Sequence, residues 1–315
     1  MKVAVIGCGS IGVRYVQWLV DLGVDVIAQD VDPARVASLV GTTRLTVATT
    51  LDEVLCGRPD RVLVATPPNA HASVACAALE AGAGVLVEKP IAVTLEDAAR
   101  VVEAAERLQR LAWVVCNMRF HDGPRTLKAS LARIGTPLFG RAHFGHRLSQ
   151  MRPTDRKVYA SSSFEGGGVV LDCIHEIDYL QWLFGEVDTV EGWLGQIGPE
   201  RIDAEDYAEI LLRFISGVRV ALHLDFLMRR KRRGAEIIGT KGNLVWRSEG
   251  RAPEDCTVSF GDHQGEQILL HNPQVDAAAG YLGMLRAFLD TGKGLQTVAE
   301  GYRALTVALR AKGLA

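Results

Sequence analysis

The stretch of sequence that decides the fold reads Lys2-Val3-Ala4-Val5-Ile6, followed directly by Gly7-Cys8-Gly9-Ser10-Ile11-Gly12. The first five residues are mostly apolar and β-branched, which predicts a buried strand. The glycines then follow the pattern G-x-G-x-x-G, and a helix-like segment covers residues 11–22. A strand, a glycine turn and a helix in this order are the context in which that pattern binds a dinucleotide.

Each glycine of the turn has a separate predicted role. Gly7 permits the tight turn, Gly9 lets the backbone approach a pyrophosphate, and Gly12 allows the helix to pack closely on the strand. The helix N-terminus at Ser10 and Ile11 offers N–H groups and positive potential to phosphates. The alternative is a tight strand–helix turn that binds no ligand.

Asp30 ends the second predicted strand, 18 residues after Gly12. A carboxylate at this place accepts hydrogen bonds from the ribose hydroxyls of a dinucleotide and repels a 2′-phosphate. Val31 and Asp32 supply no cation that could neutralise such a phosphate, and Asp32 is expected to cap the helix that Pro33 begins. The sequence therefore predicts NAD as the cofactor rather than NADP.

Strands and helices alternate through residues 1–120, the first predicted domain. The predicted strands span residues 2–6, 24–29, 45–47, 61–65, 85–88 and 112–116, and helix-like segments span 11–22, 70–81 and 95–109. Continuous apolar strands that alternate with helices predict a parallel sheet covered on both faces. The predicted fold class is therefore α/β, with an N-terminal Rossmann dinucleotide-binding domain.

The pattern changes in residues 121–315, the second predicted domain. Strands are predicted at residues 141–148, 187–196, 207–215, 219–227 and 236–245, and helices at 123–133, 170–184, 277–289 and 298–309. Successive strands joined by short glycine-containing links favour an antiparallel sheet. We expect an α+β domain that binds the substrate and mediates oligomerisation.

Bulk composition excludes several classes of partner. The formal net charge is −2, so no global field attracts nucleic acid or an anionic membrane, and no apolar run is long enough to span a bilayer. The N-terminus does not resemble a signal peptide. The six cysteines are scattered without a CxxC pair, so we expect no metal site and no disulfides, as in a cytoplasmic protein. The basic run at residues 229–233 is interpreted as a solvated hairpin end, with contact to a substrate phosphate or carboxylate as the alternative.

Three side chains have the chemistry that proton transfer requires. Lys89 closes an apolar parallel strand, and the carboxyl ends of such strands are where open α/β sheets bind ligands. An apolar wall and a cationic nicotinamide would favour its neutral form. Asp172 and His175 interrupt a buried helix one turn apart, on one predicted face. The structural alternatives are a surface lysine, an acid at a helix N-terminus and a core histidine. Glu176 is interpreted as structural, and Asp178 is left unassigned.

Three segments carry a family resemblance: residues 65–71 (Ala-Thr-Pro-Pro-Asn-Ala-His), Glu88-Lys89-Pro90, and Gly166-Gly167-Gly168 leading to Asp172, His175 and Asp178. With the glycine turn, they resemble the glucose–fructose oxidoreductase/inositol dehydrogenase (Gfo/Idh/MocA) family. That resemblance implies a Rossmann domain, a second domain with a large open antiparallel sheet, and homodimers or homotetramers formed through that sheet. It also implies NAD or NADP, a catalytic Lys89, and Asp172 and His175 facing the substrate. One departure is that Asp172 precedes His175 by three residues, where the family commonly has four.

Further residues are expected to line the cofactor and the substrate. Thr66, Pro67 and Asn69 follow a parallel strand and should line the cofactor cleft, together with Glu88. Asn117 follows the sixth strand, and its family counterpart often lies near the nicotinamide. Tyr159 is expected to donate to a substrate hydroxyl or to be a half-buried aromatic. His71 is either a packing residue or a cofactor contact.

Together, the residues and the resemblance predict an enzyme that transfers a hydride between nicotinamide and a secondary carbinol or carbonyl carbon of a sugar, cyclitol or sugar derivative. Three alternatives stay open at this point. They are a non-catalytic dinucleotide or sugar sensor, a redox-neutral epimerase or eliminase with tightly bound NAD, and an imine or amino-acid reductase.

Overall fold

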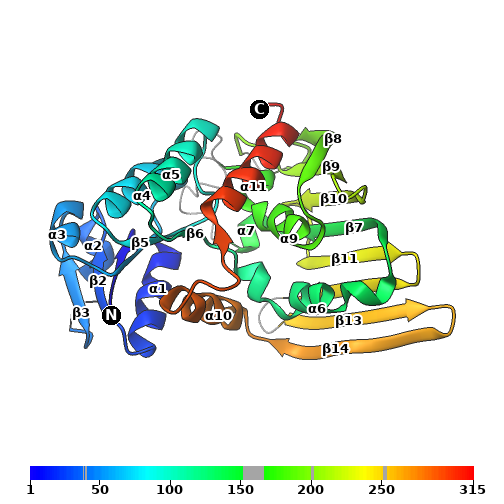
Figure 1. Cartoon of the computed structure of the whole chain (residues 1–315), viewed down its shortest axis with the longest axis horizontal. Coiled ribbons are helices and arrows are strands. Elements are labelled where there is room, and N and C mark those ends of the chain that lie inside the picture. The colour runs from blue at the N-terminus through cyan, green and yellow to red at the C-terminus, as the bar shows by residue number, and fades with distance from the viewer. Residues whose placement is uncertain (38, 40, 152–166, 200–201, 251–253) are drawn as a thin grey trace. The chain divides into compact units, whose positions relative to one another are not determined.

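The computed structural model describes residues 1–37, 39, 41–151, 167–199, 202–250 and 254–315 (Figure 1). The chain forms two compact units, one of residues 1–115 with 285–302 and the other of residues 116–284 with 303–315. No described helix combines the length and the apolar character that crossing a bilayer requires.

The first unit contains a seven-stranded sheet in the order β15-β6-β5-β4-β1-β2-β3. All neighbouring pairs are parallel except β15 with β6. The strands are β1 (Lys2–Ile6), β2 (Asp25–Gln29), β3 (Leu45–Ala48), β4 (Arg61–Val64), β5 (Gly84–Val87), β6 (Ala112–Val114) and β15 (Gln296–Thr297). The central strands are almost wholly buried, as expected of a parallel sheet covered on both faces. The predicted Rossmann architecture is confirmed.

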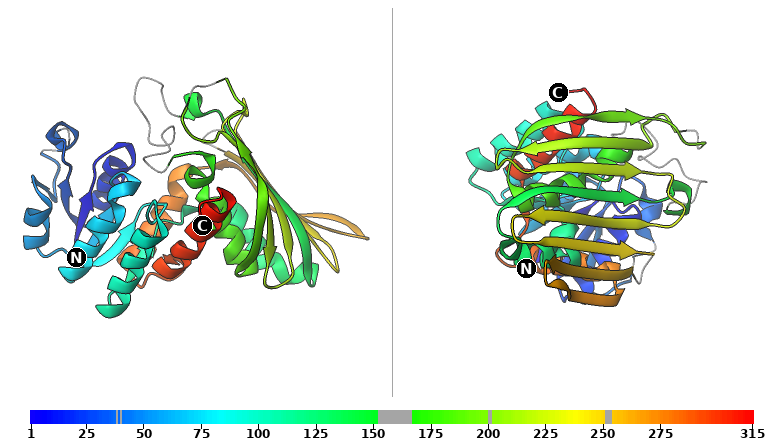
Figure 2. Two further views of the ribbon diagram at one scale, coloured as in Figure 1. Left: turned by 90° about the horizontal axis from the view of Figure 1, so that it is seen from above. Right: turned by 90° about the vertical axis from the view of Figure 1, so that its right-hand side faces the viewer.

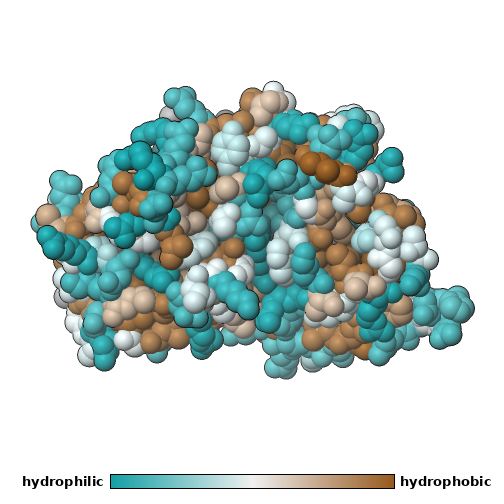
Figure 3. All heavy atoms as spheres, in the orientation of Figure 1, coloured by the Kyte–Doolittle hydropathy of each residue, from teal (hydrophilic) through white to brown (hydrophobic). Residues whose placement is uncertain are grey.

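Helices connect these strands, and threonine caps mark the start of two of them. They are α1 (Ser10–Asp21), α2 (Pro33–Ala37), α3 (Leu51–Cys56), α4 (His71–Glu80) and α5 (Leu95–Arg107). Thr50 caps α3 and Thr94 caps α5, because each hydroxyl accepts the N–H of the residue three positions later. Helix α5 buries Ala98, Val101, Ala104 and Ala105, while its charged side chains form part of the hydrophilic surface at the upper left of Figure 3.

The first unit is completed by residues from near the end of the sequence. Strand β15 pairs with β6 in the register Gln296 to Val114 and Thr297 to Trp113. The ring of Phe288 meets Trp113 edge to face at 6.0 Å. The expected division at residue 120 assigned everything beyond it to the second domain, whereas residues 285–302 pack within the first unit.

The second unit contains an eight-stranded sheet in the order β14-β13-β12-β11-β7-β10-β9-β8. Its neighbours are antiparallel except for the parallel pair β7 and β10. The strands are β7 (Pro137–Gly145), β8 (Val187–Gly195), β9 (Tyr207–Phe214), β10 (Arg219–Asp225), β11 (Arg232–Gly239), β12 (Asn243–Glu249), β13 (Glu254–Asp262) and β14 (Gly265–Val275). The large, mainly antiparallel sheet is therefore confirmed.

One face of this sheet carries helices and the other is open. Helix α6 (Asp122–Ser130) packs on β12 and β13, and α9 (Ile174–Phe184) packs on β7. The right-hand view of Figure 2 looks onto the opposite face, where no described helix covers the strands. The remaining helices are α7 (Leu148–Met151), α8 (Val169–Asp172), α10 (Ala277–Leu289) and α11 (Val298–Ala311), and short 3₁₀ turns span Pro68–Ala70, Asn117–Phe120 and Leu131–Ile134.

One prediction about the strands is wrong, and two further strands were missed. Residues 236–245 do not form one strand, because the chain turns between β11 and β12, which pair with Ile238 opposite Asn243. The Gly239 N–H donates to the Gly242 carbonyl across this turn (2.8 Å). Strands β13 and β14 were not predicted at all. Most side chains of β14 are exposed or half-buried on both faces, so its sequence lacks the alternation that marks a half-buried strand.

The predicted single helix over residues 170–184 is also wrong. The backbone breaks at Cys173 (φ −98°, ψ 21°), so Asp172 belongs to α8 and His175 to α9. Helix α8 has its own anchor, because the N–H groups of Val169 and Val170 donate to the backbone and the carboxylate of Glu205 (2.9 and 3.3 Å). The local sequence has no glycine or proline to mark a break at Cys173. The helix is interrupted there because contacts with Glu205 hold α8 separately.

Candidate functional site

The glycine turn after β1 has the geometry that its sequence predicts. Gly7 has φ +91°, and its N–H donates to the Gln29 carbonyl on β2 (2.8 Å). A Cβ on Gly12 would lie 1.9 Å from the Gly7 carbonyl oxygen, so only glycine fits there. A Cβ on Gly9 would meet nothing within 4 Å. The backbone at Gly9 is therefore open to a ligand, while Gly12 secures the contact of helix and strand.

The region around this turn fits a dinucleotide. Helix α1 begins at Ser10 with no side-chain cap and no acid in its first turn, so its N–H groups and dipole are available to an anion. At the end of the neighbouring strand β4, the Thr66 hydroxyl is buried without a hydrogen-bond partner among the described atoms. The open backbone at Gly9 and the uncapped N-terminus of α1 would accommodate phosphates. The Thr66 hydroxyl would find a hydrogen-bond partner in the bound dinucleotide.

Asp30 is buried just after β2, and its carboxylate accepts hydrogen bonds from the backbone of the glycine turn and of the segment that follows β2. Its Oδ2 accepts the Cys8 N–H (2.6 Å), and its Oδ1 accepts the Asp32 N–H (2.8 Å). Asp32 in turn accepts the Ala34 N–H (3.0 Å), as expected of a cap for α2. The structure adds Arg35, whose Nη1 lies 3.6 Å from Asp30 Oδ2. Sequence reasoning examined only Val31 and Asp32 and missed this cation one helical turn further on.

The loops after β4 and β5 are joined by His71. Thr66 is half-buried, whereas Pro67 and Asn69 are exposed. The two ring nitrogens of His71 lie 2.7 Å from the Pro90 carbonyl oxygen and 2.8 Å from the Thr66 carbonyl oxygen. Complete burial lowers the pKa of His71 to about 4, so the neutral ring donates to one carbonyl at a time. His71 is thus a bridge between two loops at the carboxyl edge of the sheet.

Glu88 and Lys89 follow β5 at that same edge, and both are half-buried. The Tyr15 hydroxyl on α1 donates to Glu88 Oε1 (2.5 Å), and the Lys89 N–H donates to Glu88 Oε2 (3.0 Å). Glu88 therefore ties the segment that carries Lys89 to the helix behind the glycine turn. These two hydrogen bonds hold the backbone of Lys89 in place. They do not involve the Lys89 amine, whose role in proton transfer is a proposal.

In the second unit, Asp172 is buried and His175 is half-buried. His175 Nε2 lies 3.8 Å from Oε1 of the fully buried Glu176. Arg233 Nε lies 2.9 Å from the same oxygen, although the two groups are not aligned for a hydrogen bond. Burial raises the pKa of Glu176 to about 7, and the Arg233 charge opposes that rise. The buried pair of Glu176 and Arg233 is thus next to the His175 ring.

The basic run at residues 229–233 is not a hairpin end, because β7 lies between β10 and β11 in the sheet, and it is only partly solvated. Arg229, Arg230 and Arg232 are exposed, but Arg233 is 7% exposed and its guanidinium lies 3.7 Å from the centre of the Phe144 ring. Lys231 forms a nearly buried ion pair with Glu254. The interpretation as a fully solvated run is therefore wrong, because two of the five cations pair with internal carboxylates.

Asp178, which the sequence left unassigned, is the buried partner of Arg119. The guanidinium contacts both carboxylate oxygens, with Nε at 3.0 and 3.1 Å and Nη2 at 2.6 Å. Both side chains are about 5% exposed. This bidentate pair joins α9 to the 3₁₀ turn over Asn117–Phe120. Asn117 itself is half-buried at the start of that turn.

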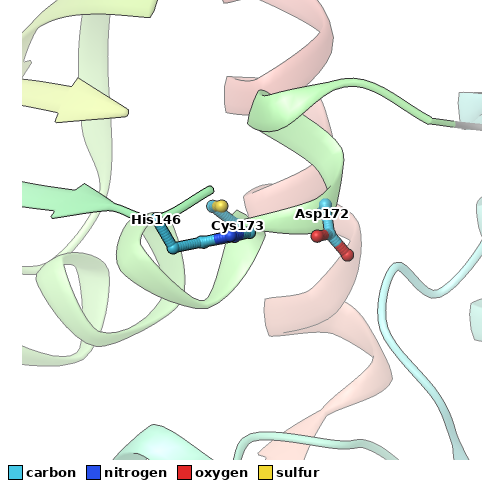
Figure 4. A group of neighbouring side chains, drawn as sticks. All are labelled: His146, Asp172 and Cys173. Carbon is cyan, nitrogen blue, oxygen red and sulfur yellow. The ribbon is translucent and has the colours of Figure 1, made fainter. Parts of the chain in front are cut away.

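The structure also brings together side chains that the sequence did not connect. His146, just after β7, lies with Asp172 and Cys173 in a buried group whose nitrogen, oxygen and sulfur atoms are all within 4.8 Å of one another (Figure 4). Only Asp172 of these three was a predicted site residue, and no local sequence signal links residue 146 to the α8–α9 junction. The predicted residues Tyr159 and Gly166 lie outside the described residues.

Comparison with known families accounts for most of the chain. Residues 1–116 match the oxidoreductase family with an NAD-binding Rossmann fold, and residues 125–245 match the GFO/IDH/MocA C-terminal domain. An inositol 2-dehydrogenase from Acidothermus cellulolyticus is 32% identical over 265 residues, which cover 79% of this chain and 73% of that protein. A 1,5-anhydro-D-fructose reductase from Ensifer adhaerens is 31% identical over 229 residues, with 70% of this chain and 67% of that protein covered.

A further relative is similar over a shorter range. Inositol 2-dehydrogenase 3 from Saccharopolyspora erythraea is 36% identical over 193 residues, and the chain spans about half of that protein's length (54%).

Solved structures share the whole fold. An oxidoreductase from Agrobacterium radiobacter, in complex with NAD⁺, L-tartaric acid and magnesium, superposes with a TM-score of 0.85 at 22% identity, covering 100% of this chain and 96% of that chain. The WlbA dehydrogenase from Bordetella pertussis, in complex with NADH and UDP-GlcNAcA, gives a TM-score of 0.81 at 21% identity, covering 99% of this chain and 96% of that chain. At these identities the likeness concerns the fold alone. The matches to both family domains and the 32% identical relative show that the chain belongs to the Gfo/Idh/MocA family of NAD-binding oxidoreductases.

Proposed function

We propose that this chain is an NAD-dependent dehydrogenase or reductase acting on a secondary carbinol or carbonyl carbon of a sugar, cyclitol or sugar derivative. The observation that carries the proposal lies within the first unit. Lys89 follows β5 at the same sheet edge as the open glycine turn after β1, with β4 between them. A proton-transfer group at the dinucleotide-binding edge of a parallel sheet is what oxidation of a carbinol requires. The relatives, two inositol 2-dehydrogenases and a 1,5-anhydro-D-fructose reductase, support the same substrate class.

The bound nicotinamide supplies the hydride acceptor or donor, and the side chains supply the rest. Lys89 takes or gives the hydroxyl proton. His175 positions the reacting hydroxyl or shares its proton, and Asp172 orients Lys89 and His175 and offsets their charge. The glycine turn, Asp30 and Thr66 bind the adenosine diphosphate half, while Pro67, Asn69, Glu88 and Asn117 line the cofactor. Tyr159 is retained as a proposed donor to the substrate.

The test is an assay of purified protein with a panel of inositols, sugars, sugar acids and nucleotide sugars, each with NAD and with NADP. We expect net reduction of NAD with at least one polyol or cyclitol. Turnover efficiency should be higher with NAD than with NADP, because the buried Asp30 carboxylate repels a 2′-phosphate. Arg35 is half exposed and already faces Asp30 and Asp32, so we expect it not to reverse this preference.

The same assay separates the alternatives. A sensor would bind dinucleotide without turning it over, and a redox-neutral enzyme would convert substrate without net change in nicotinamide absorbance. Reduction of imines in preference to carbonyl compounds would indicate an amine-forming reductase. Equal or better use of NADP would contradict the role given to Asp30.

We also propose a cytoplasmic location. All six cysteines lie among the described residues and none of them forms a disulfide, and four are buried. Free thiols are typical of proteins in a reducing compartment. Fractionation of the native host, with an antibody against the chain, would test this directly, and recovery in an oxidising compartment would contradict it.

We propose, in addition, that two or four copies associate through the open face of the eight-stranded sheet. This face exposes large apolar side chains, with Trp193 79%, Leu211 56% and Phe139 42% exposed. The strand registers place them on one side of the sheet, opposite the buried residues of β9 and β7. Apolar side chains gathered on one face of a sheet are typical of an interface.

Changing Leu211 to glutamate should disrupt this assembly, because each copy would then bring a charge into an apolar contact. Light scattering after size exclusion should give an oligomer for the wild type and a monomer for the variant. Leu111→Glu is the matched control, since Leu111 is 57% exposed but lies in the first unit, before β6. A wild-type protein that stays monomeric at all concentrations would overturn the proposal.

A further inference from the structure

We propose that His146, Asp172 and Cys173 form a binding site for one zinc-class divalent ion. The three side chains come from two separate parts of the second unit, the end of β7 and the junction of α8 with α9 (Figure 4). They are 3%, 6% and 0% exposed. An imidazole nitrogen, a carboxylate oxygen and a sulfur atom are the three kinds of ligand that zinc takes from proteins.

The spacing of the ligand atoms suits a single ion after a small closure. The three atoms lie within 4.8 Å of one another. Ligands at zinc distances of about 2.0–2.3 Å stand about 3.3–3.8 Å apart in a tetrahedron. Rotating the Asp172 and Cys173 side chains around their one or two side-chain bonds can shorten the distances between the ligand atoms by about 1 Å. Three protein ligands leave a fourth position for water or another small ligand.

The surroundings hold the imidazole and strengthen the site. His146 lies between Phe144 and Phe226, with ring centres 5.1 and 5.2 Å away. Packing between two phenyl rings restricts the imidazole, so little side-chain entropy is lost when an ion binds. The apolar neighbours also lower the local dielectric, which strengthens the attraction between a cation and anionic ligands.

The charges balance when a divalent ion binds. Cys173 loses its thiol proton to solvent, the resulting thiolate and the Asp172 carboxylate each carry one negative charge, and His146 binds as the neutral ring. Two negative charges then meet one doubly positive ion, so the buried group is neutral as a whole. This match favours a transition metal with affinity for sulfur and nitrogen over Mg²⁺ or Ca²⁺, which prefer oxygen ligands.

Binding would have a functional consequence that rests on the proposed function. Asp172 is assigned there to orienting the polar groups around the substrate, and a metal-bound carboxylate could not do so. Occupation of the site should therefore inhibit turnover. The site would make the enzyme sensitive to zinc through residues that lie outside the cofactor-binding unit.

The binding test uses the full chain, stripped with chelator, and Co²⁺ as a spectroscopic probe. We expect one Co²⁺ per chain, a thiolate-to-cobalt charge-transfer band in the near ultraviolet, and displacement of Co²⁺ by Zn²⁺. Cys173→Ser should abolish the band, and His146→Gln should weaken binding by about 100-fold or more, because each removes a direct ligand. Circular dichroism and the thermal midpoint establish that each variant is folded.

Two other cysteines provide the controls. Cys256 is buried like Cys173 but lies on β13, so Cys256→Ser should leave Co²⁺ binding unchanged. Cys56 is exposed and is the place where a metal would bind adventitiously, so all titrations are repeated in a Cys56→Ser background. Failure of the wild type to bind Co²⁺ or Zn²⁺, or binding that survives in both Cys173→Ser and His146→Gln, would overturn the proposal.

The consequence for activity is measured separately, so that its failure differs from a failure of the proposed function. Metal binding needs neither cofactor nor substrate and is tested even if no turnover is found. Where turnover is found, Zn²⁺ should inhibit the wild type and leave Cys173→Ser much less affected. Equal inhibition of both proteins would show that zinc acts elsewhere and would remove the functional part of the inference.

Discussion

Replacing Lys89 with methionine should slow turnover by about 10²–10⁴-fold, the usual scale for loss of a positioned acid–base group. Methionine keeps most of the apolar stem but has no ammonium group. The fold and the affinity for NAD should survive, because the glycine turn, Asp30 and the Tyr15 contact to Glu88 do not involve the Lys89 amine. Steady-state kinetics at saturating NAD, with a parallel dinucleotide titration, measure both quantities.

The kinetic pattern decides between two roles for Lys89. A proton-transfer group lowers kcat, whereas a group that binds ground state and transition state equally raises KM and spares kcat. Lys293→Met is the matched control, because Lys293 is an exposed lysine of the same unit. A Lys89→Met enzyme with near-normal kcat would return Lys89 to a structural role.

Changing Asp178 to asparagine should lower the free energy of unfolding of the second unit by about 3–5 kcal/mol. The change removes the carboxylate from the buried Arg119 guanidinium, and loss of one partner of a buried ion pair has a cost of that size. Asparagine is nearly the same size as aspartate, so the effect reports the charge rather than a cavity. Urea unfolding followed by circular dichroism provides the measurement.

The chain offers a close control for this prediction. Arg213 and Asp188 form a pair with the same 2.6 Å separation, but their side chains are 51% and 47% exposed. Exposed pairs are worth about 0–1 kcal/mol, so Asp188→Asn should change stability by less than about 1 kcal/mol. Similar losses in both variants would contradict the view that burial gives the Arg119–Asp178 pair its weight.

The first unit was largely predictable from its sequence. Strand β1 and the glycine turn were found at their observed positions, because an apolar run, three glycines and an acid at residue 30 are all local signals. The steric reason for Gly12, its contact with the Gly7 carbonyl, follows from the same pattern. Arg35 and the His71 bridge were missed, since they depend on where a short helix and two loops meet in space.

The second unit was less predictable. Its antiparallel sheet was expected, but β13 and β14 were missed, and β14 lacks a buried face because most of its side chains are exposed or half-buried. The break at Cys173 carries no local signal, and the burial of Lys231 and Arg233 depends on partners elsewhere in the sequence. The sequence of a charged or an apolar segment does not reveal whether residues far away in the chain will pair with it.

The pairing of β15 with β6 has a consequence for synthesis of the chain. A ribosome releases residues 1–115 long before Gln296 and Thr297 emerge, so the newly made sheet waits with one edge of β6 unpaired. Exposed edges are where a sheet adds strands from other molecules. Nascent chains should therefore depend most on protection from aggregation during that interval, which ends only when Gln296 and Thr297 have left the exit tunnel.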